Sequence, residues 1–178
     1  KPSGGYAYYK DGTLTLNNYS YAGKGYQYDS EDGYYATVFA DRFLTVELVG
    51  TNSLKQTASL SKGIRVGDEG FRKLAIHGDG SLNVTSTQCG ISVKGSIVVN
   101  GGTIISTATD GGMYKSIGIE SIGIDVTIKG GNVTVAGDYG LWVPNGSCEI
   151  KGGTVTATGI DHAIEYSTGF TALEGMYI

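Results

Sequence analysis

Proline, cysteine and long apolar runs are scarce in this chain of 178 residues, which has two prolines and two cysteines. Two cysteines are too few for a disulfide framework, so a small disulfide-stabilised scaffold is excluded. No apolar run approaches the roughly 18 residues that a membrane-spanning helix needs. Glycine is abundant, at 30 residues, but it follows no three-residue period, which excludes collagen.

Basic charge is also limited. The 13 lysines and arginines are outnumbered by 17 aspartates and glutamates, so the net charge is -4. Nucleic-acid-binding proteins normally carry a clustered basic face, so we expect no nucleic-acid partner. The acidic balance also disfavours anionic polysaccharides unless a bound cation intervenes. A hydrophobic fraction of 40% argues against disorder, and the length suits one domain.

One sequence module recurs through most of the chain. It consists of two alternating apolar pairs around a Gly-Gly or similar turn, a second turn, and then a small residue followed by an aliphatic one. Val126 and Cys148, which begin the last two copies, stand 22 residues apart. A period of roughly two dozen residues is typical of solenoid repeats. The five copies lie at residues 44–66, 74–93, 97–119, 126–143 and 148–166.

The alternation within each copy predicts the fold. Each copy holds three short segments in which apolar and polar residues alternate, as in half-buried strands. One coil cannot bury its inward residues alone, so the coils must stack. We therefore predict an all-β single-stranded right-handed parallel β-helix, with three short strands per coil and very little helix. The prediction is one domain over 1–178, with a Tyr-rich cap and first coil at 1–40, repeated coils at 41–168, and a C-terminal end at 169–178 that contributes a last partial strand.

Aligning the copies predicts which side chains share a row. Cys148 aligns with Val126 and should point into the core as a small hydrophobe. Cys89 aligns instead with Ile117 and Tyr139, so a disulfide is disfavoured and two free buried thiols are expected. A further row points outward, and its mixed chemistry indicates a solvated surface. That row contains Arg65, Ser92, Glu120, Trp142 and Glu165.

Aromatic residues concentrate at the N-terminus, where nine of the 13 tyrosines fall at or before Tyr35. They could cap the open end of the solenoid, which would otherwise expose its core. They could also bind sugar, because an exposed tyrosine offers an apolar face and a polar tip. The hydrophilic segment 24–33 is expected to protrude. The candidate ligand-binding residues are Tyr26, Tyr28, Tyr34, Tyr35 and Trp142, the only tryptophan.

Acidic side chains suggest two places for a hard cation such as calcium, which prefers oxygen ligands. The first is Asp29, Glu31 and Asp32 in the protruding segment, and the second is Asp138 with Asp161, aligned at the turn before the third segment of consecutive copies. Aspartate is equally common in ordinary turns. The second pair is also the only arrangement that could serve a glycoside hydrolase, which needs two carboxyl groups. We predict no catalytic residues, and calcium is the only candidate cofactor.

Three stretches carry a family resemblance. GTLTLNN at 12–18, LTVELVGTNSL at 44–54 and GGTVTATG at 152–159 resemble repeat regions of surface proteins from anaerobic Gram-positive bacteria. More loosely, the chain resembles the calcium-containing β-helical carbohydrate-binding domains of cellulolytic clostridia. The first resemblance implies display outside the cell, and the second implies polysaccharide binding without cleavage. The calcium ligands of that second group are not matched to positions in this chain.

Three functions of different classes follow from these observations. The leading hypothesis is a non-catalytic extracellular module that binds polysaccharide through its tyrosines and Trp142. The second is a stalk or adhesin spacer that holds another domain away from the cell wall. The third, a polysaccharide lyase or glycoside hydrolase, has the least support. We expect a monomeric fragment of a larger cell-surface protein, without a membrane span.

Overall fold

The computed structural model describes residues 4–110 and 112–172. Over these residues the chain forms strands and turns and no helix, which confirms the all-β prediction. None of the described residues therefore belongs to a helix long and apolar enough to cross a membrane. The last strand of the described residues is β19 (Gly169–Ala172). The candidates for the expected last partial strand, Leu173 and Met176 to Ile178, lie outside the described residues.

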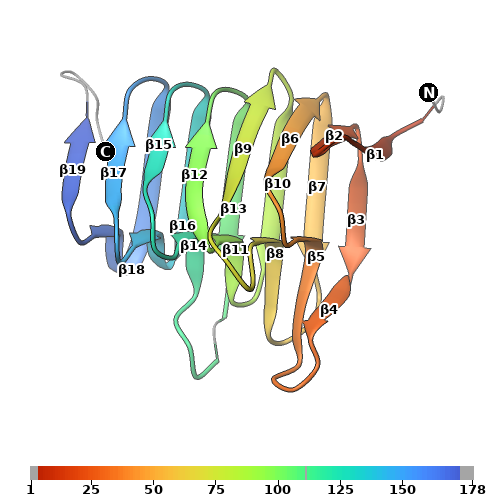
Figure 1. Cartoon of the computed structure of the whole chain (residues 1–178), viewed down its shortest axis with the longest axis horizontal. Helices are drawn as coiled ribbons and strands as arrows, with labels where there is room; N and C mark the ends of the chain where they lie inside the picture. Colours follow the sequence, from red (N-terminus) through yellow and green to blue (C-terminus); the bar gives the residue numbers. More distant parts are fainter. Residues whose placement is uncertain (1–3, 111, 173–178) are drawn as a thin grey trace.

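The strands form two long sheets that run the length of the molecule (Figure 1). The first sheet has eight strands, and all its neighbours pair in parallel except β1 and β2. In spatial order its strands are β1 (Tyr6–Lys10), β2 (Thr13–Asn17), β6 (Leu44–Val49), β9 (Arg72–Gly78), β12 (Gly95–Val99), β15 (Val126–Ile128), β17 (Ser147–Ile150) and β19.

The second sheet has eleven strands and folds back on itself through the long strand β16, which pairs with both β13 and β14. Its order is β3 (Ser20–Gly23), β7 (Thr51–Gln56), β10 (Ser81–Ser86), β13 (Thr103–Ala108), β16 (Asn132–Val143), β14 (Ile117–Ser121), β11 (Cys89–Val93), β8 (Ser61–Val66), β5 (Tyr34–Ala40) and β4 (Tyr26–Asp29), with β18 (Thr154–Tyr166) paired to β16.

Equivalent strands of successive repeats lie side by side. The strands β6, β7 and β8 pair in parallel with β9, β10 and β11, which pair in turn with β12, β13 and β14. This succession of pairings is that of a β-solenoid, whose coils stack at about 4.8 Å. Inward aliphatic side chains from every coil form one continuous core between the sheets.

The predicted core row is confirmed. Leu74 pairs with Ile97, Ile97 with Val126, and Val126 with Cys148, and all four side chains are buried. Cys89 lies in the other row, next to Ile117, and both thiols are free and buried as expected. Register is fixed because a slip by one residue would turn every inward side chain of a strand outward.

One predicted turn is absent. Asp138 was expected in a turn between two strands, but it lies within β16, and Asp161 lies within β18. The two strands bend and continue, with an irregularity in their pairing between Gly137 and Tyr139. An extra residue in one strand bends it without ending it, so the chain turns the corner here with no loop.

The N-terminal end is capped by two antiparallel additions, β1 on β2 and β4 on β5. Leu14 and Leu16 of β2 and Val38 of β5 pack on the core, as predicted for the first coil. A hollow of about 1010 Å³ remains between the two additions, and aliphatic core residues and tyrosines line most of it. The hydrophilic segment forms the β4–β5 hairpin, whose tip projects beyond the edge of the solenoid (Figure 1).

Candidate functional site

The face formed by β5, β8, β11, β14 and the second halves of β16 and β18 carries the most distinctive surface of the molecule. Two segments outside the regular repeat project beside it: the β4–β5 hairpin and the connection between β13 and β14 (Figure 1). The predicted outward row runs along this face in the predicted register. It joins Phe39 to Arg65, Ser92, Glu120, Trp142 and Glu165.

Aromatic rings of the hairpin stack at the first end of this face. The rings of Tyr26 and Phe39 are 5.6 Å apart, and those of Tyr28 and Phe39 are 5.3 Å apart. The stack continues from Tyr28 to Tyr34 at 6.1 Å. Antiparallel pairing of β4 with β5 brings these residues together, and the turn between them includes Gly33 with a φ of 72°, which glycine adopts without strain.

Tyr34 links the hairpin to the connection between β13 and β14. Burial, followed by a side-chain hydrogen bond with Tyr114, raises the pKa of Tyr34 above its ordinary value, and a hydrogen bond with Gln88 opposes this shift. Tyr114 itself is half exposed, at 53%. The two projecting segments therefore meet over β11.

A pocket of about 240 Å³ opens between Tyr114 and Trp142. Its floor includes the side chain of Cys89, whose pKa is raised by burial, so this thiol is neutral. Amide, ammonium and carboxylate groups stand beside aromatic rings around it, and the mixture suits a ligand with both apolar and hydroxyl surfaces. The lining residues are Lys62, Gln88, Cys89, Tyr114, Lys115, Ile117, Glu120, Tyr139 and Trp142.

Aromatic rings continue beyond the pocket. The rings of Tyr139 and Trp142 are 5.9 Å apart, and His162 stacks on Tyr139 at 5.6 Å. The Trp142 indole Nε1 donates to Glu165 Oε1 at 3.4 Å, which helps to orient the ring. We call the whole series of rings the aromatic track. Its members are Tyr26, Phe39, Tyr28, Tyr34, Tyr114, Trp142, Tyr139 and His162.

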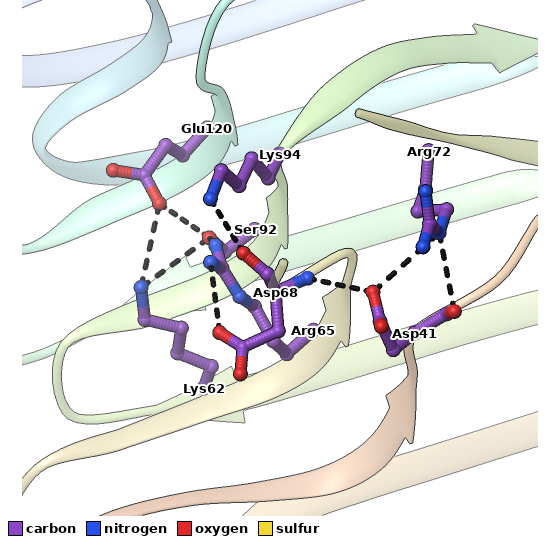
Figure 2. Close-up of polar contacts among 8 residues, drawn as sticks. All are labelled: Asp41, Lys62, Arg65, Asp68, Arg72, Ser92, Lys94 and Glu120. Carbon is purple, nitrogen blue, oxygen red and sulfur yellow. Dashed lines mark hydrogen bonds and ion pairs between the residues drawn. The ribbon is translucent and has the colours of Figure 1, made fainter. Parts of the chain in front are cut away.

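A buried polar network lies beside the pocket (Figure 2). Lys62 Nζ is 3.6 Å from Glu120 Oε2, Arg65 donates to Ser92 Oγ at 2.9 Å, and Ser92 Oγ donates to Glu120. Arg65 lies 3.9 Å from Asp68, whose backbone nitrogen donates to Asp41. Further contacts extend the network to Lys94 and Arg72.

The sequence-based expectation that this row is solvated was wrong for three of its members. Arg65 is 7% exposed, Glu120 is 5% exposed and Ser92 is fully buried. Tyr28 of the hairpin covers part of this row, because it lies close to Arg65. Burial raises the pKa of Tyr28, and the positive charge of Arg65 opposes the rise. A charged row can be buried in this way because its members pair with one another.

The candidate ligand-binding residues divide into two groups. The structure brings Tyr26, Tyr28, Tyr34 and Trp142 onto one face as members of the aromatic track. Tyr35 belongs to neither the stacked pairs of this track nor the lining of the pocket, and its backbone nitrogen donates to Leu60 O at 3.1 Å.

Four rings of the aromatic track were missed in the sequence: Phe39, Tyr114, Tyr139 and His162. The alternation of apolar and polar residues on β5 could have placed Phe39 outward. Tyr139 was aligned with Cys89, but its ring was not recognised as part of the pocket lining. No local signal marks Tyr114, because its segment is an insertion without a counterpart in the other repeats.

The acidic residues of the hairpin form a turn. Asp29 Oδ1 accepts hydrogen bonds from the backbone nitrogens of Glu31 and Asp32 at 3.0 and 3.1 Å. Among residues 4–110 and 112–172, no group of three or more histidine, cysteine or acidic side chains is close enough to hold one metal ion.

Asp138 and Asp161 each hold the β13–β14 connection. Asp138 Oδ2 accepts from the backbone nitrogen and hydroxyl of Ser116 at 2.8 and 3.0 Å. Lys115 Nζ is 2.6 Å from Asp161 Oδ2. These two carboxylates thus have partners in the protein.

Comparison with known protein families identifies a related family. A family model described as carbohydrate-binding domain-containing protein matches residues 10–177. Neither the curated proteins nor the solved structures contain a match to this chain.

Proposed function

The chain belongs to the family of carbohydrate-binding domain-containing proteins, and from this premise we propose that it is a non-catalytic module that binds polysaccharide along the aromatic track. The observation that carries the proposal is the track itself, which joins stacked rings on both sides of a pocket with mixed polar and aromatic walls.

The chemistry of the track suits a sugar chain. Pyranose rings have apolar faces that pack on aromatic rings, and hydroxyl groups that need hydrogen-bonding partners. Gln88, Lys62 and Glu120 at the pocket provide donors and acceptors beside Trp142 and Tyr114. Because the two groups of rings lie towards opposite ends of one face, with β8 and β11 between them, we propose that the polysaccharide runs along the stacking direction of the coils.

The proposal includes the setting of the module. A right-handed solenoid with three strands per coil would hold the rings at fixed spacing, and we propose that it works outside the cell as part of a larger surface protein. Calcium remains a proposed ligand of the acidic turn at Asp29, Glu31 and Asp32, where the exposed Glu31 and Asp32 side chains would have to move together around the ion. The alternative is a stalk, which would have no ligand.

Affinity electrophoresis tests the proposal. The purified chain is run through gels containing cellulose derivatives, pectin, xylan or mucin glycans, first with calcium and then with chelator. We expect at least one polysaccharide to retard the chain, because the track presents preformed rings. Loss of retardation in chelator would indicate a metal at the acidic turns.

Matched variants locate the site. Trp142→Ala should abolish most of the retardation, whereas Tyr8→Ala, which removes an exposed ring from β1 on the other sheet, should not. Equal migration of the wild-type chain in every gel would contradict polysaccharide binding and favour the stalk. Release of sugar fragments that stops in Asp138→Asn would instead indicate an enzyme.

A further inference from the structure

The β13–β14 connection is an insertion in the repeat. It comprises residues 109–116 between Ala108 and Ile117, whereas only residues 87–88 join β10 to β11 at the equivalent place. A longer connection samples more conformations, and fixing each residue of it costs conformational entropy. Tyr114 can form a fixed wall of the pocket only if this segment is restrained.

The restraints are concentrated next to Tyr114. Ser116 donates twice to Asp138 Oδ2, and its hydroxyl accepts from the backbone nitrogen of Asp138 at 2.9 Å. The preceding residue, Lys115, pairs with Asp161 at 2.6 Å. Two carboxylates from the adjacent strands β16 and β18 therefore hold two consecutive residues, immediately after the ring that faces Trp142 across the pocket.

The Asp138 carboxylate acts in its charged form. The hydrogen bond from the Ser116 backbone is the main reason that the pKa of Asp138 lies below its usual value. The hydrogen bond and the charge of Asp161 raise the pKa of Lys115. Charge-assisted hydrogen bonds such as those from Ser116 to Asp138 are stronger than neutral ones, so they are suited to holding this segment. The exposed ion pair of Lys115 with Asp161 adds a smaller restraint.

From this geometry we propose that Asp138 and Asp161 are positioning residues that hold Tyr114 against the pocket and thereby set its width and affinity. The proposal rests on the polysaccharide-binding function for its effect on affinity. Its structural part, the placement of Tyr114, is independent of any ligand. The sequence made these two residues candidates for metal binding or acid catalysis, and the proposal assigns them a different role.

The test uses a double variant that carries both Asp138→Asn and Asp161→Asn. Its control is the single variant Asp125→Asn. Asp125 Oδ1 accepts from the backbone nitrogen and hydroxyl of Ser147 at 2.7 and 2.8 Å, the same arrangement at a place that does not line the pocket. Trp142 is the only tryptophan, so its fluorescence reports on the pocket without added ligand. The melting temperature is recorded for each variant.

In the double variant, we expect acrylamide to quench Trp142 more strongly and the emission to shift to longer wavelength. Asp125→Asn should leave the quenching and the emission wavelength unchanged. The single variant Asp161→Glu, which keeps the carboxylate, should lie closer to the wild-type signal than the single variant Asp161→Asn does. Affinity for the retarding polysaccharide should fall roughly tenfold, because binding must then order the segment.

The outcomes separate this proposal from the proposed function. Unchanged quenching in a double variant that melts like the wild-type chain would overturn the positioning role, whatever the affinity does. Increased quenching in a chain that binds no polysaccharide would support the positioning role and overturn the function. If the double variant fails to fold, Lys115→Met removes the ion pair with Asp161, and Ser116→Ala removes both hydroxyl contacts with Asp138 while keeping the backbone hydrogen bond. Unchanged quenching in the double variant of Lys115 and Ser116 would overturn the proposal.

Discussion

Single glycines in the repeat occupy positions where the backbone lies too close to neighbouring atoms for a side chain to fit. The small residue that precedes the aliphatic is glycine in four of the five repeats and alanine, Ala163, in the last. A side chain at each of the four glycines, Gly63, Gly90, Gly118 and Gly140, would enter occupied space. At Gly90 a methyl group would overlap Ser106 Oγ and approach Gly118 O to 2.7 Å. In these four repeats the position thus needs glycine for space, which explains why a small residue recurs there.

We expect Gly90→Ala to lower the free energy of unfolding by about 2 kcal/mol, because overpacking a filled core forces neighbours to shift. Urea denaturation followed by far-ultraviolet circular dichroism measures the change. Gly169→Ala is the control, since its nearest neighbour would be Ser147 Cβ at 4.0 Å. Equal stability of Gly90→Ala and the wild-type chain would mean that this glycine does not face the core.

At the scale of strands, the apolar alternation was enough to predict pairing. The alignments of Cys148 with Val126, of Cys89 with Ile117 and of Arg65 with Ser92 all match the observed register. Such rows are predictable because each residue of a strand has only two faces to choose from, and burial decides between them.

The environment of those rows was not predictable in the same way. Arg65 and Glu120 are buried because segments outside the repeat cover their face. A periodic pattern predicts the repeated strands, but it does not predict where an inserted segment will pack. Tyr114 enters the site for the same reason. The corner at Asp138 was misread because a bent strand and a turn use similar residues.

The buried network makes a prediction about β8, β11 and β14. Glu120→Ala would leave Lys62 and Arg65 without the carboxylate that both reach, directly or through Ser92. We expect a loss of about 3 kcal/mol in the free energy of unfolding, because an uncompensated buried charge is costly. Urea denaturation measures this loss.

The matched control is Glu149→Ala on β17. Glu149 pairs with Lys151 at 2.7 Å, but both side chains are exposed, so we expect a change within about 0.5 kcal/mol. A similar loss in the free energy of unfolding for both variants would show that the network at Glu120 is solvated and does not stabilise the fold.

At the scale of the whole molecule, the stacking of coils aligns side chains that are far apart in the sequence along one face. The first coil contributes four rings to the aromatic track and the last coils contribute the rest, from Tyr114 to His162, while β8 and β11 carry Arg65 and Ser92 in the outward row between them. The length of the track is therefore set by the number of coils between its ends. From β5 to β18 the face crosses five neighbouring strand pairs, which corresponds to about 24 Å at the usual spacing between strands. A ligand that lies along the track must therefore span several sugar units to contact both ends.

This geometry predicts how affinity depends on the length of the oligosaccharide. Affinity should rise with each added unit until the ligand covers the distance from Tyr26 to His162, and should then level off, because further units find no ring to stack on. Isothermal titration with a graded series of the polysaccharide that retards the chain measures this dependence. His162→Ala, which removes the last ring, should weaken long oligosaccharides and leave the shortest binding ones unchanged. If all lengths bind equally well, the ligand occupies only the pocket between Tyr114 and Trp142, and the rings at either end serve to cover the solenoid.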